Sequence, residues 1–429
     1  MAYQPKFVKE SPKSQNPQKP QPSAEHEMPE KKKGSKVRFV LFVLLGFLVV
    51  PASCWATWNQ LVGMYEILGR PKAAALTKTP DMAIMEKLDA HVAEMVQSAR
   101  NNLLAVEHPD YAPEEVVEET LPPVRKVYWI DEGTQVAPEP KQECYGETDD
   151  PTTLQSLLDE AAYILDGQEL YFSTDVELFQ GSKVTYYLED SILAITWKEV
   201  HDGSVYTFSE VKVSHPSQFR RHLAGGEYGS DYQYKTTEMA ESVNAVVASS
   251  GDFYRFRDFG AVVYEGKAKR VEGTYAETCY IDSNGDMHFT YGGDVLTVEA
   301  VQAFVDEHDI QFSLAFGPIL VDNYEVVEHS WYGVGEILEG YARAALCQMG
   351  ELHYIVVTAN TEGPYQDIPT VALFQKYIAA TGCKMAYCLD GGQTAAIVMN
   401  DRLINRPVYG EQRKISDIIY FATAVPEGG

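Results

Sequence analysis

The 429-residue chain has a hydrophobic content of 45%, which is enough for a sizeable folded core. Its formal net charge is −27, and residues 1–38 carry nine Lys/Arg and four Glu, so the remainder carries −32. Nucleic-acid binding needs Lys and Arg to displace counterions from phosphates. A body this acidic excludes a nucleic-acid partner.

A basic tail and an apolar run open the chain. Residues 1–38 have almost nothing to bury, which predicts a disordered cytoplasmic tail. Residues 39–58 are about as long as the ~20 residues that a helix needs to cross a membrane. Because the basic residues precede this run, we expect a signal anchor with the C-terminal body outside. A cleaved signal peptide and a lipid-modified Cys54 are the alternatives.

Two further segments separate the anchor from the folded body. Residues 59–110 include apolar positions at helical spacing and predict a helical stalk. Residues 111–150 are rich in Pro and Glu and predict an extended acidic linker. We therefore expect the folded domain to span 151–429.

Within that domain the residue patterns predict more strands than helices. The turn residues at 201–204 predict a β-hairpin. Helices are predicted at 153–165, 297–308 and 368–382. Strands are predicted at 182–200, 204–214, 244–250, 260–270, 342–348, 352–360, 384–389, 395–400 and 417–424. Because strands and helices do not alternate strictly, the pattern indicates an α+β fold, a single sheet-rich mixed domain with packed helices.

The six cysteines show no ligand spacing with histidine. Cys383 and Cys388 are separated by four residues across a predicted strand, unlike a tight zinc knuckle. Buried thiols are the expected state, and disulfides remain possible outside the cell. The full set is Cys54, Cys144, Cys279, Cys347, Cys383 and Cys388.

The stretch CLDGGQTAAIVMNDRLINRP, residues 388–407, concentrates the residues suited to chemistry. Asp390 ends an apolar strand, where sites commonly form at the rim of a sheet. Gly391 and Gly392 permit close backbone approach and can form an anion-binding nest, to which Thr394 adds a hydroxyl. Asp-Gly is also a common hairpin turn, so a purely structural role is the alternative.

An ordered set of motifs spans roughly residues 206–424. It comprises SSGDFYRFRDFGAVVYEGKAKR (249–270), FGPILVDNYEVV (316–327), ARAALCQMGELHYIVVTAN (342–360), VALFQKYIAATGCKMAYCLDGG (371–392), INRP (404–407) and RKISDIIY (413–420). This set resembles the phosphodiester glycosidase family, which includes bacterial members associated with exopolysaccharide. The resemblance implies hydrolysis of a sugar–phosphate link, giving a free sugar and a phosphomonoester.

The resemblance also implies roles for particular residues. A phosphodiester needs cationic or N–H donors, and an oxocarbenium-like transition state needs carboxylates. Asp252 and Asp390 are the implied catalytic carboxylates. The implied substrate-binding groups are Arg343, Arg413, Thr394, Asn405 and the backbone of Gly391 and Gly392. Asp252, Asp390 and Asn405 would suit Ca²⁺ if they converged, but the sequence leaves metal and cofactor dependence open.

Several positions depart from the family pattern. Ser250 precedes Gly251 and Asp252 where the family has Asn, and Gln393, Thr394 and Ala395 follow Asp-Gly-Gly where it has Gly and serines. The stretch TANTEGP (358–364) lacks the family's arginine, and Tyr341-Ala342-Arg343-Ala344 stands for Asn-Pro-Arg-Thr.

Two functions remain open. The first is a membrane-anchored extracellular hydrolase that acts on glycosyl-phosphodiesters of an envelope polysaccharide. The second is a catalytically degenerate member that binds an anionic glycopolymer or a protein partner at the cell surface. The sequence does not determine the oligomeric state.

Overall fold

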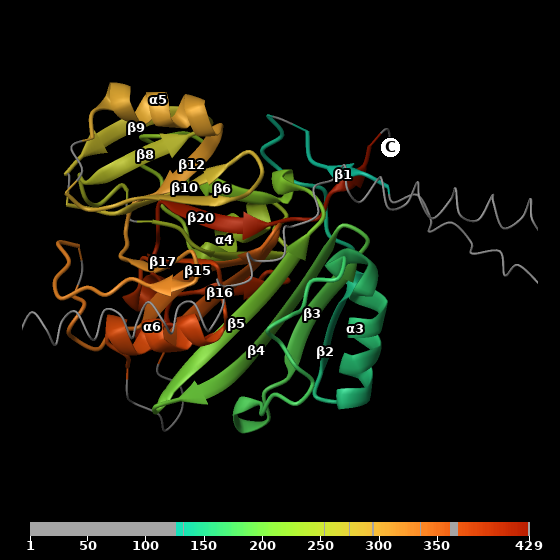
Figure 1. Ribbon diagram of the computed structural model, residues 1–429. Coiled ribbons are helices and arrows are strands. Elements are labelled where there is room, and N and C mark those ends of the chain that lie inside the picture. Colours follow the sequence, from blue (N-terminus) through green and yellow to red (C-terminus); the bar gives the residue numbers. More distant parts are fainter. Residues whose placement is uncertain are drawn as a thin grey trace, which may run out of the picture. The chain divides into compact units, whose positions relative to one another are not determined.

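The computed structural model describes residues 126–131, 133–252, 254–273, 275–293, 296–334, 336–360 and 368–427 (Figure 1). The predicted tail, anchor and stalk (1–38, 39–58 and 59–110) lie outside the described residues. Among the described residues, no helix is both long and apolar enough to cross a membrane.

A nine-stranded antiparallel sheet forms the centre of the fold, in the order β14-β13-β17-β15-β16-β5-β4-β3-β2. Its strands are β2 (Tyr145–Thr148), β3 (Val184–Glu189), β4 (Ile192–His201), β5 (Ser204–Val213), β13 (Ile319–Asp322), β14 (Glu325–Val326), β15 (Arg343–Gly350), β16 (His353–Asn360) and β17 (Met385–Leu389).

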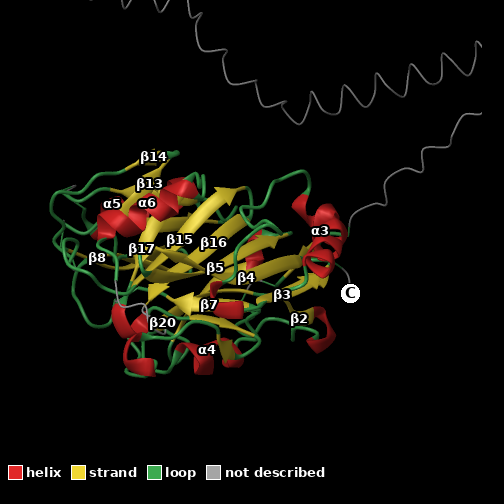
Figure 2. Cartoon of the chain, turned by 90° about the horizontal axis from the view of Figure 1, so that it is seen from below, coloured by secondary structure: helices red, strands yellow, loops and turns green. Residues whose placement is uncertain are grey.

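The helices α3 (Pro151–Leu165) and α6 (Val371–Ala380) cover one face of this sheet (Figure 2). Both begin at side-chain caps, because Asp150 accepts a hydrogen bond from Thr153 N at 3.0 Å and Thr370 accepts one from Leu373 N at 3.2 Å. Alternate residues of β15 and β16 face these helices, which gives one of the two large apolar cores.

A second sheet, the β7 sheet, packs on the other face of the nine-stranded sheet. Its order is β19-β18-β7-β20-β6. Helix α4 (Thr236–Ser242) covers its outer side, and Figure 2 shows α4 on the opposite side of the molecule from α6. The strands are β6 (Phe219–Leu223), β7 (Val247–Ser250), β18 (Ile397–Met399), β19 (Arg402–Leu403) and β20 (Asp417–Phe421).

A third sheet, the β8 sheet, carries α5 (Val298–His308) on one face (Figure 1). Its order is β11-β10-β12-β8-β9. The strands are β8 (Gly260–Tyr264), β9 (Lys267–Glu272), β10 (Thr278–Asp282), β11 (Met287–Thr290) and β12 (Ile310–Leu314). The domain is therefore sheet-rich with packed helices, which confirms the mixed class predicted from the sequence.

Local predictions are confirmed where turn chemistry is clear. β4 and β5 form the expected hairpin, with Asp202 and Gly203 both at positive φ. The regular fold begins earlier than residue 151, however. β2 lies in the predicted linker and pairs with β3, and β1 (Tyr128–Trp129) pairs with β21 (Val425–Pro426). Backbone pairing holds both segments, and Tyr145 of β2 and Tyr128 of β1 also pack against apolar cores.

Candidate active site

Asp390 follows the last residue of β17, where the chain leaves the nine-stranded sheet for the β7 sheet. The short 3₁₀ turn η4 (Gly392–Thr394) makes this crossing. Since β17 and β18 belong to different sheets, the alternative interpretation of Asp-Gly-Gly as a hairpin turn is wrong. The crossing places a carboxyl group at the rim where the two sheets meet.

The two glycines are required by the backbone rather than by a ligand. A Cβ at Gly391 would lie 2.4 Å from the carbonyl oxygen of Ala342, and Gly392 has a φ of +65°. The N–H of Gly392 donates to Ala342 O at 2.8 Å. The N–H of Gly391 is directed at the Asp390 carboxylate. These two amides are therefore occupied, and they do not form the predicted oxyanion cradle.

The Asp390 side chain is buried, and the pKa of its carboxyl group is raised toward neutral pH. Burial raises the pKa of Asp390 to about 6, against the opposing effects of a hydrogen bond with Thr394 and the charges of Arg413 and Arg257. The Thr394 hydroxyl oxygen also lies 2.7 Å from Gly391 O, so its single proton serves either this carbonyl or the carboxylate. A carboxyl group that titrates near neutral pH can accept or release a proton during a reaction.

Arg413 is the predicted arginine that the fold brings beside Asp390. Its backbone N–H donates to Gln393 O at 3.4 Å, and its guanidinium group lies 5.0 Å from the centre of the Phe256 ring. Arg413, Phe256 and Arg257 are exposed. The buried acid therefore feels the charge of two exposed arginines, one of which lies over an exposed aromatic ring.

Asp252 occupies a different, closed environment. Its side chain is fully buried, and Oδ1 lies 2.9 Å from Nη2 of Arg221 while it also accepts from Tyr254 N at 2.7 Å. Oδ2 accepts from Ala315 N at 2.9 Å. With both oxygens engaged, Asp252 is better suited to positioning the chain than to the predicted catalytic role.

Arg221 and Asp417 complete this buried cluster. Arg221 Nε and Nη2 each lie 2.9 Å from Oδ2 of Asp417. Although burial alone would lower it, the two carboxylates raise the pKa of Arg221. Burial raises the pKa of Asp417, and the charge of Arg221 opposes that shift. A Cβ at Gly251 would lie 2.0 Å from Asp417 Oδ2, which explains the glycine before Asp252.

Arg343 is not placed as a phosphate ligand. Its Nη2 donates to the carbonyls of Glu336 and Glu339 at 2.6 and 2.7 Å, and its Nε donates to Pro369 O at 3.3 Å. Burial lowers the pKa of its guanidinium group. These contacts tie two loops to the start of β15, which is a structural task.

Asn405 is likewise engaged by the fold. Its Oδ1 accepts from Ile397 N at 2.8 Å, and its Nδ2 donates to Ala395 O at 2.8 Å and to Asn360 Oδ1 at 2.9 Å. It therefore fixes the segment after η4 against β16. Asn360 was noted in the segment TANTEGP but was not among the predicted site residues, because its only signal was its place at the end of an apolar strand.

No group of three or more His, Cys, Asp or Glu side chains in the described ranges could hold a metal ion. Of the three residues considered for Ca²⁺, Asp252 and Asn405 are bound within separate hydrogen-bond networks.

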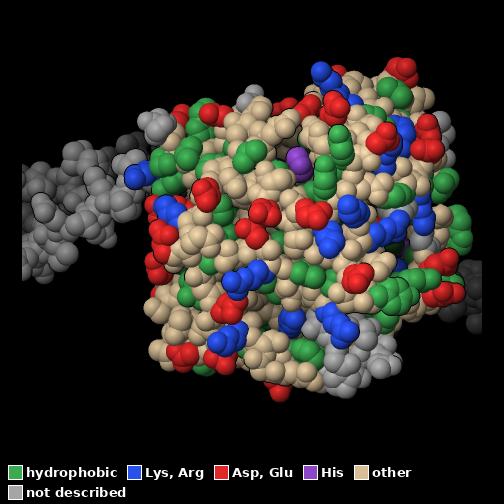
Figure 3. Space-filling model, turned by 180° about the vertical axis from the view of Figure 1, so that it is seen from behind, with side chains coloured by type: hydrophobic (Ala, Val, Ile, Leu, Met, Phe, Trp, Pro, Cys, Tyr) green, Lys and Arg blue, Asp and Glu red, His purple; other side chains and the backbone are tan. Residues whose placement is uncertain are grey.

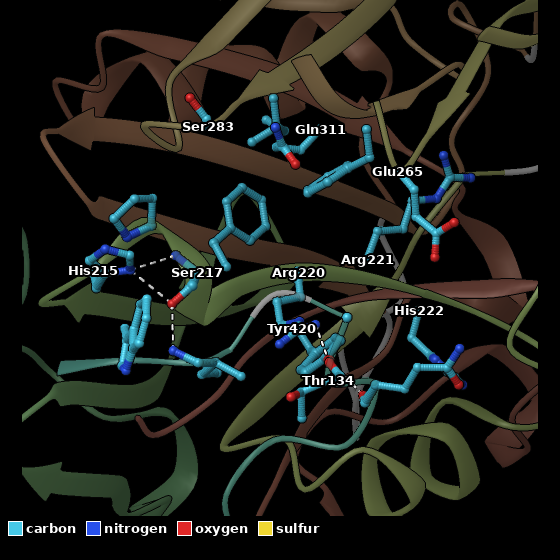
Figure 4. A pocket seen from close by; sticks show the side chains of 18 of the residues that line it. Thr134, His215, Ser217, Arg220, Arg221, His222, Glu265, Ser283, Gln311 and Tyr420 are labelled. Carbon is cyan, nitrogen blue, oxygen red and sulfur yellow. Dashed lines mark hydrogen bonds between the residues drawn. The ribbon is translucent and has the colours of Figure 1, made fainter. Parts of the chain in front are cut away.

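A separate cavity of about 590 Å³ lies between β6, the 3₁₀ turn η3 (Pro216–Gln218) and the β8 sheet (Figure 4). Figure 4 shows His215 and Ser217 at one end and Arg220, His222 and Tyr420 along β6 and β20. Its lining contains none of the eight predicted site residues. The candidate site and this cavity are therefore distinct.

Comparison with known proteins accounts for the site motifs. Residues 243–422 match the family model for phosphodiester glycosidase. This segment is similar to the phosphodiester glycosidase family. It contains Asp252, Arg343, Asp390, Asn405 and Arg413. Among curated proteins, none matches the chain.

Solved structures similar to this chain include the following three. The catalytic domain of zebrafish N-acetylglucosamine-1-phosphodiester alpha-N-acetylglucosaminidase, auto-inhibited by its pro-peptide, is 17% identical over 61% of this chain and 92% of that one, with a TM-score of 0.43. A hypothetical protein from Synechocystis is 13% identical over 58% of this chain and 64% of that one, with a TM-score of 0.40. A putative exported protein from Burkholderia pseudomallei K96243 is 12% identical over 51% and 74%, with a TM-score of 0.33. This chain thus spans less than two thirds of the Synechocystis protein.

Proposed function

We propose that the chain is a hydrolase that cleaves a sugar from a glycosyl-phosphodiester, with Asp390 as the residue that moves the proton. The observation that carries the proposal is a buried carboxyl group with a pKa of about 6, flanked by two arginines, on the Asp-Gly-Gly turn of a phosphodiester glycosidase segment. Perturbed acids of this kind are concentrated at functional sites.

The reaction needs one proton acceptor and a cationic surface. Water adds to the anomeric carbon, the bond from that carbon to the phosphate oxygen breaks, and the phosphate leaves with the bonding electrons. The Asp390 carboxylate takes the proton from the attacking water. A phosphomonoester is a good leaving group as an anion. Its oxygen therefore does not need to be protonated by a second, strongly acidic residue.

Arg413 and Arg257 supply the positive charge. Both lower the pKa of Asp390 through their charge, so they lie close enough to stabilise an anion bound next to it. In a chain whose residues beyond 38 carry −32, this local charge offsets the repulsion that an anionic substrate meets elsewhere.

A binding protein without catalysis is the second candidate. It is favoured by one observation, namely that the N–H groups of Gly391 and Gly392 are already used by Asp390 and Ala342. A site without these donors loses part of the stabilisation that a developing anion receives in acyl- and phosphoryl-transfer enzymes.

We further propose that the domain is anchored outside the cell membrane and acts on an envelope polysaccharide. The basic flank before the apolar run 39–58 supports this orientation. Protease added to intact cells stripped of their wall should remove the body and leave the tail. A body that is cut only after lysis would contradict the orientation.

Hydrolysis is tested with the full chain and a glycosyl-phosphodiester of a simple alcohol, with the released reducing sugar as the readout. The expected products are free sugar and phosphomonoester, measured with and without divalent cations. Asp390→Asn should lose this activity, while Asp159→Asn, an exposed matched change on α3, should keep it. If the wild-type chain binds the compound but releases no sugar under any condition, the binding function replaces the hydrolase.

A further inference from the structure

An exposed strip of aromatic and basic side chains leads away from the candidate site. It begins at Arg413 and Phe256 and ends at Tyr232 and Tyr234. The exposed fractions are 36% for Phe256, 62% for Tyr232 and 38% for Tyr234. Tyr232 and Tyr234 lie outside the segment that matches the family model, so that match does not assign them a role.

Backbone contacts make the strip continuous. Tyr234 and Ile415 form an isolated β-bridge, in which Ile415 N donates to Tyr234 O at 2.8 Å. Arg413 is two residues before Ile415, which corresponds to about 7 Å of extended chain. Arg255 is paired with Asp231, so the segment that carries Phe256 lies against the segment that carries the two tyrosines.

The two tyrosine rings are stacked nearly parallel to each other. Their planes differ by 11° and their centres are 6.0 Å apart. Tyr232 also packs over Gly225, where a Cβ would lie 2.8 Å from its ring, so glycine is needed for the ring to lie there. Aromatic faces bury large apolar areas at little entropic cost, and the apolar faces of sugar rings fit such a surface.

The charge of the strip is opposite to that of the chain. Residues 231–235, 255–258 and 413–414 contain five Lys/Arg and two Asp, and both Asp are paired, Asp231 with Arg255 and Asp258 with Arg270. Figure 3 shows a group of Lys and Arg side chains on the face seen from behind, beside large apolar side chains. An anionic ligand is therefore favoured here over a neutral or cationic one.

We propose that this strip is a glycan-binding subsite, which extends the candidate site so that it takes an anionic polysaccharide chain rather than a single sugar phosphate. This inference rests on the proposed function for the end of the chain that enters beside Asp390. Sugar rings pack on Tyr232, Tyr234 and Phe256, and the phosphate groups between them lie against Arg413 and its basic neighbours.

The test compares two ligands of the same chemistry: a monomeric glycosyl-phosphodiester and an oligomer of the same phosphodiester-linked unit. The full chain should bind the oligomer more tightly, because additional contacts form without a second binding event. The double change Tyr232→Ala with Tyr234→Ala should weaken oligomer binding about tenfold and leave monomer binding and cleavage unchanged.

Two matched variants control for folding. Tyr232→Phe with Tyr234→Phe keeps the rings and should bind the oligomer like the wild type. Tyr324→Ala removes a tyrosine of similar exposure, 63%, at the β13–β14 turn and should have no effect. A neutral oligosaccharide of equal length should bind more weakly than the charged oligomer.

The outcomes separate this inference from the proposed function. If the double alanine variant binds the oligomer as tightly as the wild type, or loses monomer and oligomer equally, the subsite is overturned even where hydrolysis stands. If no ligand is cleaved but oligomer binding still depends on the two rings, the subsite stands and the hydrolase fails. Equal binding of charged and neutral oligomers overturns the anionic ligand.

Discussion

Asp252 and Asp390 are both carboxylates on family motifs, yet the fold treats them in opposite ways. Asp252 lies in a closed network in which Arg221 and two backbone N–H groups use its oxygens. Asp390 is buried without an ion pair of this kind, and burial raises its pKa to about 6. A carboxylate saturated by the fold holds structure together, whereas one left poised near neutrality is available for chemistry.

The contrast between Asp252 and Asp390 is tested most directly by Asp390→Asn. This change removes the proton acceptor while preserving size, so the rate of sugar release should fall by about 10²–10⁴-fold. The variant should also be more stable at neutral pH. The measurements are kcat/KM on a glycosyl-phosphodiester and thermal unfolding at several pH values.

The sign of this stability change follows from the raised pKa of Asp390. The wild-type protein loses stability as the pH rises from the unfolded-state pKa near 3.8 to the folded value of about 6, because the buried group must ionise. Asparagine does not ionise, so the gain should approach roughly 3 kcal/mol above pH 6 and vanish below pH 4. An Asp390→Asn variant that is less stable at pH 8 would contradict this account of the site.

A substitution in the buried network of Arg221, Asp252 and Asp417 should lower stability, whereas Asp390→Asn should raise it. Arg221→Met leaves Asp252 and Asp417 buried without their cation, so the free energy of unfolding should fall by about 3–5 kcal/mol. Chemical denaturation at pH 7 measures this loss. Lowering the pH should return part of it, because protonated carboxyl groups no longer need Arg221. If Arg221→Met folds normally but abolishes only catalysis, the network belongs to the reaction after all.

Arg413→Gln tests the proposed role of positive charge beside Asp390. It removes one cationic partner of an anionic substrate, and charge-assisted hydrogen bonds are worth about 1.5–3 kcal/mol. The expected result is a rise in KM of about ten- to a hundredfold with little change in stability, since Arg413 is exposed. Arg402→Gln, an exposed change on β19, is the control. Equal effects of the two changes would show that only overall charge matters.

The sequence predicted those site residues whose signal lies in their immediate sequence neighbours. Asp390 follows a strand and precedes two glycines, a pattern that by itself left a structural turn open and that gained its functional interpretation from the family resemblance. Arg413 was found through the resemblance of its motif to the family. The mixed, sheet-rich class followed from strands and helices that do not alternate strictly.

The missed parts depend on contacts between distant residues. Arg221 and Asp417 are 196 positions apart in the sequence, so no local sequence pattern predicts that they form an ion pair. The task of Arg343 could not be predicted either, because its acceptors are backbone carbonyls that carry no sequence signal. The same holds for β2, which is ordered by pairing with β3 rather than by an apolar pattern of its own.

The smallest expected effect concerns Thr394. Its hydrogen bond with Asp390 favours the ionised carboxylate, so it lowers a pKa that burial has raised. Thr394→Val removes the hydroxyl at nearly constant volume, and the loss of about 1 kcal/mol of hydrogen bonding should raise the pKa of Asp390 by roughly 0.5–1 unit. Because the reaction uses the ionised form, the rise of kcat/KM with pH should shift from a midpoint of about 6 toward 7.

Thr394→Ser keeps the hydroxyl and should keep the wild-type profile. If both variants share one profile, Asp390 is not the titrating group, and the contrast with Asp252 does not explain catalysis.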